Sequence, residues 1–189
     1  MKKISFVLFT AAISLSSFAQ TAWKNDKMHS QLKFEITHLG VSTVSGAFTD
    51  FDVTINSTKP DFSDATFELT AKSASINTGV EYRDNDLKSA GFFDVATFPT
   101  VTFKSTGIKK TSADKYQLTG NLTMHGITKP VTMELWYRGT LTNPMSKKID
   151  AGFRLTGQLK RDDFAIGGKY PGAILSEEVT IVADGEFGQ

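Results

Sequence analysis

The chain has 189 residues, of which 40% are hydrophobic and 22% charged, with 21 Lys and Arg against 20 Asp and Glu. This length predicts a single domain, and a formal net charge of +1 argues against an electrostatic nucleic-acid partner. The sequence contains no cysteine, which excludes a disulfide framework, a thiolate nucleophile, a Cys-ligated zinc site and an iron–sulfur cluster.

Residues 1–19 have the layout of a cleaved secretory signal peptide. Lys2 and Lys3 precede an apolar run, and Ser17 and Ala19 supply small residues at the cleavage-recognition positions. The run is about a dozen residues long, whereas a membrane-spanning helix needs about 20. We therefore predict that residues 1–19 are removed after export, and that residues 20–189 form one domain without an integral membrane segment.

Eight later segments alternate apolar and polar residues, which is the period of β-strands that bury one face. Their apolar positions are Leu32, Phe34, Ile36; Phe51, Val53, Ile55; Ala65, Phe67, Leu69, Ala71; Val101, Phe103; Tyr116, Leu118, Leu122, Met124; Val131, Met133, Leu135, Tyr137; Ala151, Phe153, Leu155; and Val179, Ile181, Ala183. Turn-forming residues separate the segments, as at Pro60 and Asn143. One apolar and one polar face per strand predicts antiparallel sheet.

Two segments break this alternation. Residues 84–93 predict a short helix, with Leu87 on its apolar side and Gly91 at its end, and residues 161–177 predict a long irregular connection. No long amphipathic helix is available to cover an open sheet. We therefore predict an all-β fold in which eight antiparallel strands close into a barrel rather than pair as a sandwich. The interior of such a barrel is either filled by side chains or holds one small or slender ligand.

The titratable residues do not predict an active site. His29 and His38 would face opposite sides of an unbroken strand, and His125 falls in a predicted turn, so a metal site is disfavoured. The sequence has no Gly-x-Ser-x-Gly elbow and no phosphate-binding glycine-rich loop. The carboxylate pairs, such as Asp162 with Asp163, fall in predicted loops, where solvated turns explain them. We predict no catalytic residue, no metal and no enzymatic activity.

Two arginine–carboxylate groups are the remaining polar candidates. Arg83 with Asp84, and Arg161 with Asp163, lie beside apolar residues in segments that are not strands, which predicts positions at the barrel ends. Such pairs could brace a connection against the barrel rim. Alternatively, they could form a polar mouth that meets the head group of an amphiphile. The residues alone leave both interpretations open.

A series of motifs runs in order from about residue 23 to about residue 185: Trp23, His29-Ser30, His38, Gly46-x-Phe48, Ser75-Ile76-Asn77, Arg83-Asp84-x-x-Leu87, Phe92-Phe93-Asp94, Phe98-Pro99-x-Val101-x-Phe103, Gly120-x-Leu122-Thr123 and Arg161-x-Asp163-Phe164. In this order and spacing they resemble the YceI family. The chain departs from the family at Phe164-Ala165, where Phe-Gly is usual, and residues 142–150 match no family motif.

The resemblance implies a lipocalin-like β-barrel that holds a long amphiphile, typically a polyisoprenoid such as an isoprenoid quinone or a polyprenyl phosphate, in an apolar tunnel. It also implies export to the bacterial periplasm and no established catalytic residues. We expect the tunnel to be lined by Leu32, Phe34, Ile36, Phe51, Val53, Phe67, Leu69, Val101, Phe103, Leu118, Met133, Leu135, Phe153 and Leu155, with Phe92, Phe93 and Phe98 near one end. At the mouth we expect His29, His38, Arg83, Asp84 and Arg161, with the arginines as hydrogen-bond donors to a head group.

Two other functions remain open at this point. A barrel with a filled core could bind a partner protein on its outer surface, as an interaction or stress-response module of the cell envelope. A hydrolase would require Asp84 or Asp163 to converge with a second carboxylate across a cleft. The volume of the interior distinguishes a lipid carrier from a filled barrel. The sequence does not specify the lipid, the end that opens, or whether the protein forms a homodimer.

Overall fold

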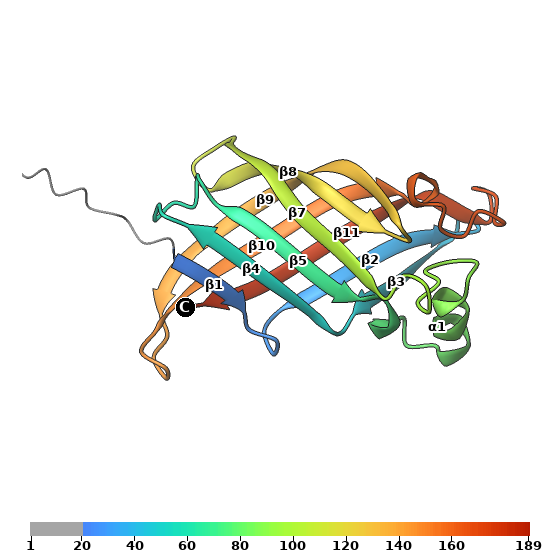
Figure 1. Cartoon of the computed structure of the whole chain (residues 1–189), viewed down its shortest axis with the longest axis horizontal. Helices are drawn as coiled ribbons and strands as arrows, with labels where there is room; N and C mark the ends of the chain where they lie inside the picture. The colour runs from blue at the N-terminus through green and yellow to red at the C-terminus, as the bar shows by residue number, and fades with distance from the viewer. Residues whose placement is uncertain (1–20) are drawn as a thin grey trace, which may run out of the picture.

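The computed structural model describes residues 21–189, and the predicted signal peptide at 1–19 lies outside them. Strands dominate this part of the chain (Figure 1). In chain order they are β1 (Thr21–Asn25), β2 (Gln31–His38), β3 (Ser42–Phe48), β4 (Phe51–Ser57), β5 (Thr66–Lys72), β6 (Ile76–Asn77), β7 (Thr100–Lys110), β8 (Lys115–Met124), β9 (Ile127–Thr142), β10 (Ile149–Lys160) and β11 (Leu175–Gly188). The helical segments are α1 (Glu81–Lys88) and two 3-10 turns, η1 (Ser73–Ser75) and η2 (Arg161–Phe164).

The strands form a closed antiparallel barrel with eight positions around its axis. Three positions each hold two short strands end to end: β1 with β2, β3 with β4, and β5 with β6. Each position pairs with the next one along the chain, and β11 closes the barrel by pairing with both β1 and β2. This is the up-and-down arrangement, which leaves no long unpaired edge. The prediction of an all-β, eight-stranded, lipocalin-like barrel with one short helix is confirmed.

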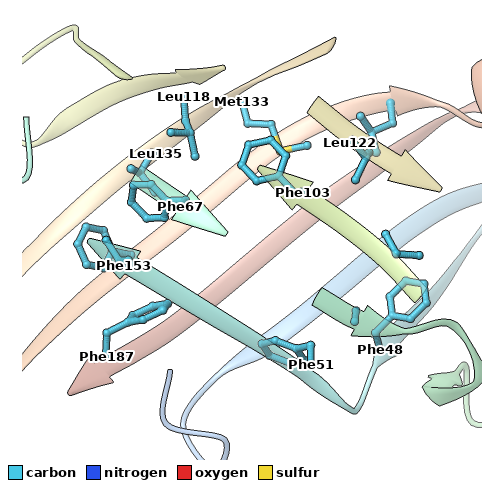
Figure 2. Packing of buried hydrophobic residues seen from close by; sticks show 14 of the residues in the cluster. Phe48, Phe51, Phe67, Phe103, Leu118, Leu122, Met133, Leu135, Phe153 and Phe187 are labelled. Atoms are coloured by element: carbon cyan, nitrogen blue, oxygen red, sulfur yellow. The ribbon is translucent and has the colours of Figure 1, made fainter. Parts of the chain in front are cut away.

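Alternating burial explains why these segments form strands. Along β8, Tyr116, Leu118 and Leu122 are buried, whereas Gln117 and Asn121 are exposed. Burial of each large apolar side chain contributes about 1.5–3 kcal/mol. Because side chains of a strand alternate between its two faces, one regular alternation directs every large apolar residue of β8 into the barrel. The other strands follow the same rule, and Figure 2 shows their apolar side chains facing one shared interior.

The helix differs in position from the prediction. It spans Glu81–Lys88 rather than residues 84–93, so Asp84 lies inside it instead of at its start. The reason is a local hydrogen-bond pattern, since the Asp84 carboxylate accepts the backbone N–H and the hydroxyl of Thr78, which precedes the helix. The helix ends at Lys88, before Gly91, and the N–H of the next residue, Ser89, donates to the carbonyl of Asp86. The predicted irregular connection begins with η2 and ends at Leu175, where β11 begins.

The barrel end near Thr21 and Gln189, which we call the closed end, is covered by the β4–β5 loop of residues 58–65. Phe62 in this loop is 2% exposed, and its ring contacts the rings of Trp23, Tyr137 and Phe153, which belong to three different strands. The hydroxyl of Tyr116 donates to the carbonyl of Asp61 in the same loop. The loop therefore reaches across the opening and fills it with aromatic side chains.

The opposite end, which we call the α1 end, carries α1, residues 89–99 and the β10–β11 connection (Figure 1). The last two segments contact each other. The N–H of Gly167 donates to the carbonyl of Gly91 over 3.0 Å, and the rings of Phe92 and Tyr170 lie 5.5 Å apart. The two barrel ends therefore differ: regular strands and an aromatic layer form one, and irregular segments form the other.

Candidate functional site

Two adjoining cavities occupy the barrel interior. The inner cavity, in the middle of the barrel, has a volume of about 140 Å³, and the outer cavity, at the α1 end, has a volume of about 310 Å³. Both are bounded by the same five side chains, Phe34, Phe48, Met124, Leu159 and Ile181. These residues lie where the inner cavity meets the outer one, so the two cavities form consecutive sections of one space.

Almost all residues predicted to line a tunnel do line this space. The inner cavity is bounded by Leu32, Phe34, Phe51, Val53, Phe67, Leu69, Val101, Phe103, Leu118, Met133, Leu135, Phe153 and Leu155, and the outer cavity by Phe34, Ile36, Phe92 and Phe93. Figure 2 shows several of these side chains around the inner cavity, with Phe153 and Phe187 on one side and Phe48 on the other. The inner cavity thus has an almost entirely apolar wall.

Phe98 is the exception among the predicted lining residues. Its ring lies 5.0 Å from that of His125, edge to face, at the β8–β9 turn, and it borders neither cavity. A Cβ placed on Gly126 would come within 2.5 Å of the same ring, so the turn is tightly packed against it. The position of Phe98 close to Phe92 and Phe93 in sequence therefore does not bring it to the same cavity.

Further wall residues were not among the predicted site residues. On the predicted strands, the same alternation could have identified Leu122, Met124, Ile181 and Ala183, and its continuation along β10 and β11 leads to Leu159 and Phe187. The irregular β10–β11 connection supplies Ile166, Tyr170 and Ile174 to the outer cavity. These three have no periodic signal, because their positions depend on how the connection folds over the barrel.

Arg161 is buried and holds the β10–β11 connection. Its side chain is 4% exposed, and its N–H groups donate to backbone carbonyls between residues 166 and 176. Nε donates to Ser176, Nη1 to Ile166 and Gly167, and Nη2 to Tyr170 and Leu175, over 2.7–3.1 Å. A guanidinium has five N–H donors, and all five are used here. Although Arg161 borders the outer cavity, these contacts make it a brace for the connection.

Arg83 is placed differently. It is half-buried on α1, borders the outer cavity, and donates from Nε to the hydroxyl of Thr78 over 2.8 Å and from Nη2 to its carbonyl over 3.1 Å. Neither contact uses Nη1, and this nitrogen has no hydrogen-bond partner among residues 21–189. Asp86 and His38 border the same cavity. A cationic donor with an uncommitted nitrogen therefore stands at the α1 end of an apolar space.

The remaining predicted mouth residues lie outside the cavity walls. His29 is an exposed residue of the β1–β2 loop, and its Nδ1 lies 2.9 Å from the Asp26 carboxylate. This hydrogen bond and the negative charge of Asp26 raise the pKa of His29. Asp84 is buried, but its carboxylate faces Thr78 rather than a cavity. The structure thus brings together His38, Arg83 and Arg161, and it places His29 elsewhere.

Ala165 keeps the backbone that a glycine would favour. It follows η2 with φ of 53°, in the left-handed region, and its side chain is exposed. Glycine adopts this conformation without the steric cost that a Cβ brings. The departure from Phe-Gly at Phe164-Ala165 therefore places an alanine in a conformation that glycine adopts at lower cost.

Among residues 21–189, no helix is long and apolar enough to cross a membrane. In the same part of the chain, no three or more His, Cys, Asp and Glu side chains are grouped so that they could hold a metal ion.

Comparison with known proteins agrees with this architecture. The sequence matches the YceI-like domain over residues 23–187. It is 37% identical to Protein YceI of Salmonella arizonae, over 98% of both chains. The YceI protein of Campylobacter jejuni has a similar structure, with a TM-score of 0.74, 30% identity, and coverage of 82% of this chain and 90% of that one.

A polyisoprenoid binding domain from Saccharophagus degradans, described as implicated in plant cell wall breakdown, shares the fold with a TM-score of 0.66. It is 14% identical, and the match covers 90% of this chain and 99% of that one. The domain match over residues 23–187 and the Salmonella relative together show that this chain belongs to the YceI family.

Proposed function

We propose that this protein binds a long-chain isoprenoid lipid, with the tail in the two cavities and the head group at the α1 end. The observation that carries the proposal is the pair of adjoining cavities inside the barrel, of which the inner has an almost entirely apolar wall and the outer is bordered by Arg83, Asp86 and Arg161. The polyisoprenoid binding domain from Saccharophagus degradans, which has the same fold, supports this ligand class.

An apolar wall is sufficient to bind such a tail. Each methylene that leaves water contributes about 0.8 kcal/mol, so a tail of a few isoprene units gains on the order of 10 kcal/mol before ordering costs. Few polar contacts are then needed for affinity. We infer that Arg83 recognises the head group, because a guanidinium nitrogen can donate to a quinone carbonyl or to a phosphate oxygen.

The cavities favour this function over the filled barrel. A filled core would leave no space for a tail, whereas the interior here contains two adjoining cavities. Catalysis has less support, since the Asp84 carboxylate accepts two hydrogen bonds from Thr78 and the family's barrel is a binding fold. We therefore propose a binding protein that performs no reaction.

We further propose that the protein works after export, in the bacterial periplasm, as a carrier or a sequestering protein. The layout of residues 1–19 supports export. A lipid with a long apolar tail is nearly insoluble in the aqueous space of the envelope, and enclosure of its tail in a barrel would keep it dispersed.

Mass spectrometry of an organic extract tests the lipid-binding proposal. The protein should be expressed with residues 1–19 intact, purified from the periplasmic fraction without detergent, and extracted alongside an exported protein of similar size that has no cavity. An isoprenoid lipid present near equimolar amounts in this extract and absent from the control is expected. Extracts that repeatedly lack any lipid, from protein that also takes none up from vesicles, would contradict the proposal.

A further inference from the structure

The inner cavity ends at a wall of aromatic side chains that meet at Phe153. This residue borders the cavity and is 3% exposed. Its ring centroid lies 5.8 Å from that of Phe67 and 5.5 Å from that of Phe187, which border the cavity beside it. It also lies 4.9 Å from Phe62 and 5.3 Å from Tyr137, which border neither cavity and stand behind it. Phe153 therefore separates the cavity from the aromatic layer of the closed end.

The loop behind this wall is held firmly in place. The Asp64 carboxylate accepts hydrogen bonds from the Ser57 hydroxyl, at 2.5 Å, and from the backbone N–H of Thr58, at 3.1 Å. Lys110 of β7 forms an ion pair with Asp61 over 3.0 Å. Because the loop is fixed at several points, a ligand that reaches Phe153 cannot pass it without disrupting packed and hydrogen-bonded structure.

Near the start of β2, the inner cavity is bordered by Ser30, Gln31 and Lys33, of which Gln31 and Lys33 are exposed. Ser30 packs against Gly185 there, so that a Cβ on Gly185 would lie 2.5 Å from the Ser30 hydroxyl. At the α1 end, the outer cavity borders the exposed residues His38 and Ile174. Along the barrel axis, the space therefore runs from the α1 end to the aromatic wall at Phe153.

We propose that Phe153 sets the longest isoprenoid tail that the barrel can enclose. This inference rests on the proposed function. Between Leu175 in the outer cavity and Phe187 beside Phe153, β11 spans roughly 30 Å of the barrel axis, at about 3.3 Å per residue and a strand tilt of about 40°. Each unit added to a tail within this length leaves water, whereas a longer tail must keep its extra units outside. Affinity therefore rises with tail length and then becomes constant.

Two substitutions move this limit in opposite directions. Phe153→Ala removes a phenyl group, which is close in size to one isoprene unit, from the end of the cavity. Ala183→Phe adds the same group to the wall of the inner cavity, since Ala183 borders it between Ile181 and Gly185 on β11. The first variant should enclose tails about one unit longer than the wild type does, and the second should enclose shorter ones.

A competition assay measures the limit directly. Each protein is incubated with phosphatidylcholine vesicles that contain equal amounts of linear polyprenols, from farnesol upward in steps of one isoprene unit. It is then reisolated and extracted. Because all lengths compete for the same protein, their ratio in the extract does not depend on the fraction that is folded. For the first length beyond the wild-type limit, we expect an enrichment of about tenfold in Phe153→Ala, equivalent to about 1.4 kcal/mol.

Two further variants control for lost packing. If Phe153→Ala does not fold, Phe153→Leu replaces it and should shift the ratio in the same direction. Phe164→Leu is the matched control, because Phe164 is also a fully buried phenylalanine but borders neither cavity. Its length distribution should equal that of the wild type.

The possible results separate the two proposals. A shift to longer tails in Phe153→Ala, and to shorter tails in Ala183→Phe, supports the assignment. Wild-type protein that takes up polyprenols with the same length distribution as all variants would overturn the role of Phe153 and leave the proposed function standing. Wild-type protein that takes up no polyprenol of any length would overturn both.

Discussion

Replacement of Arg161 by alanine removes the donors that hold the β10–β11 connection. The guanidinium is 4% exposed, and its five N–H groups all donate to carbonyls of residues 166–176. A hydrogen bond to a charged group contributes about 1.5–3 kcal/mol. The five do not add, because carbonyls near the surface, such as that of Tyr170, bind water once the arginine is gone. We expect Arg161→Ala to lower the free energy of unfolding by about 3–5 kcal/mol, since several bonds of this strength are lost together and water replaces only some of them.

Thermal unfolding followed by circular dichroism measures this loss, which corresponds to a fall of about 10 °C in Tm for a chain of this size. Arg83→Ala is the comparison, since Arg83 is half-buried and bonded only to Thr78 within residues 21–189. It should cost less than about 1 kcal/mol and weaken binding of a polyprenyl phosphate more than of a polyprenol. The reasoning fails if Arg161→Ala unfolds like the wild type and loses affinity only for lipids with charged head groups, or if Arg83→Ala weakens both ligands equally.

Three further changes test separate features. Gly46→Ala should reduce polyprenol uptake about tenfold, or about 1.4 kcal/mol, because its Cβ would lie 2.4 Å from Cζ of Phe34 and push that ring toward the passage between the cavities. Gly168→Ala has open space around it and is the control; equal uptake by both variants would contradict the reasoning. Ala165→Gly should raise the free energy of unfolding in urea by up to about 1 kcal/mol, since it relieves the left-handed φ; a loss of stability would show that no strain is stored there. Burial raises the pKa of Asp64, but hydrogen bonds from Ser57, Thr58 and the Lys59 N–H outweigh it and lower the pKa to about 2. The stability that this carboxylate contributes is present above about pH 4 and is lost as the pH falls toward 2, so unfolding at several pH values should show a shallower dependence in Asp64→Asn. An identical dependence in both proteins would exclude Asp64 as a source.

The fold was largely predictable because each strand buries one face. Alternation in segments such as 116–124 identifies the segment as a strand and shows which of its side chains face the interior. The order of the segments also gives each strand's neighbours, since an up-and-down barrel pairs each position with the next one along the chain. The strands β1, β3 and β6 were not among the eight predicted segments, and they lack this signal. β3 places Gly46 opposite Phe34 of β2, so a large side chain on one strand fills the space left by the other, and β3 read alone shows no regular apolar face.

The tunnel wall was more predictable than the mouth for the same reason. Strand residues such as Phe67 and Leu135 point inward by alternation alone, which places them on the cavity wall. The contacts of Arg161 depend on five carbonyls in the irregular β10–β11 connection. An irregular backbone has no repeating pattern of side chains from which the sequence could predict these positions. His29 lies apart from His38 because the chain leaves the barrel wall between β1 and β2, which a continuous-strand prediction does not include.

The two ends of the barrel also differ in how they could admit a ligand. At the closed end, Phe62 contacts rings from three strands, and carboxylates hold its loop. At the α1 end, residues 89–99 and the β10–β11 connection meet through the hydrogen bond between Gly167 and Gly91 and the contact of Phe92 with Tyr170. Local opening costs least where few buried contacts must break. Because Arg161 holds the connection together through the carbonyls of residues 166–176, we expect the connection to move away from residues 89–99 as one unit when a tail enters or leaves at the α1 end.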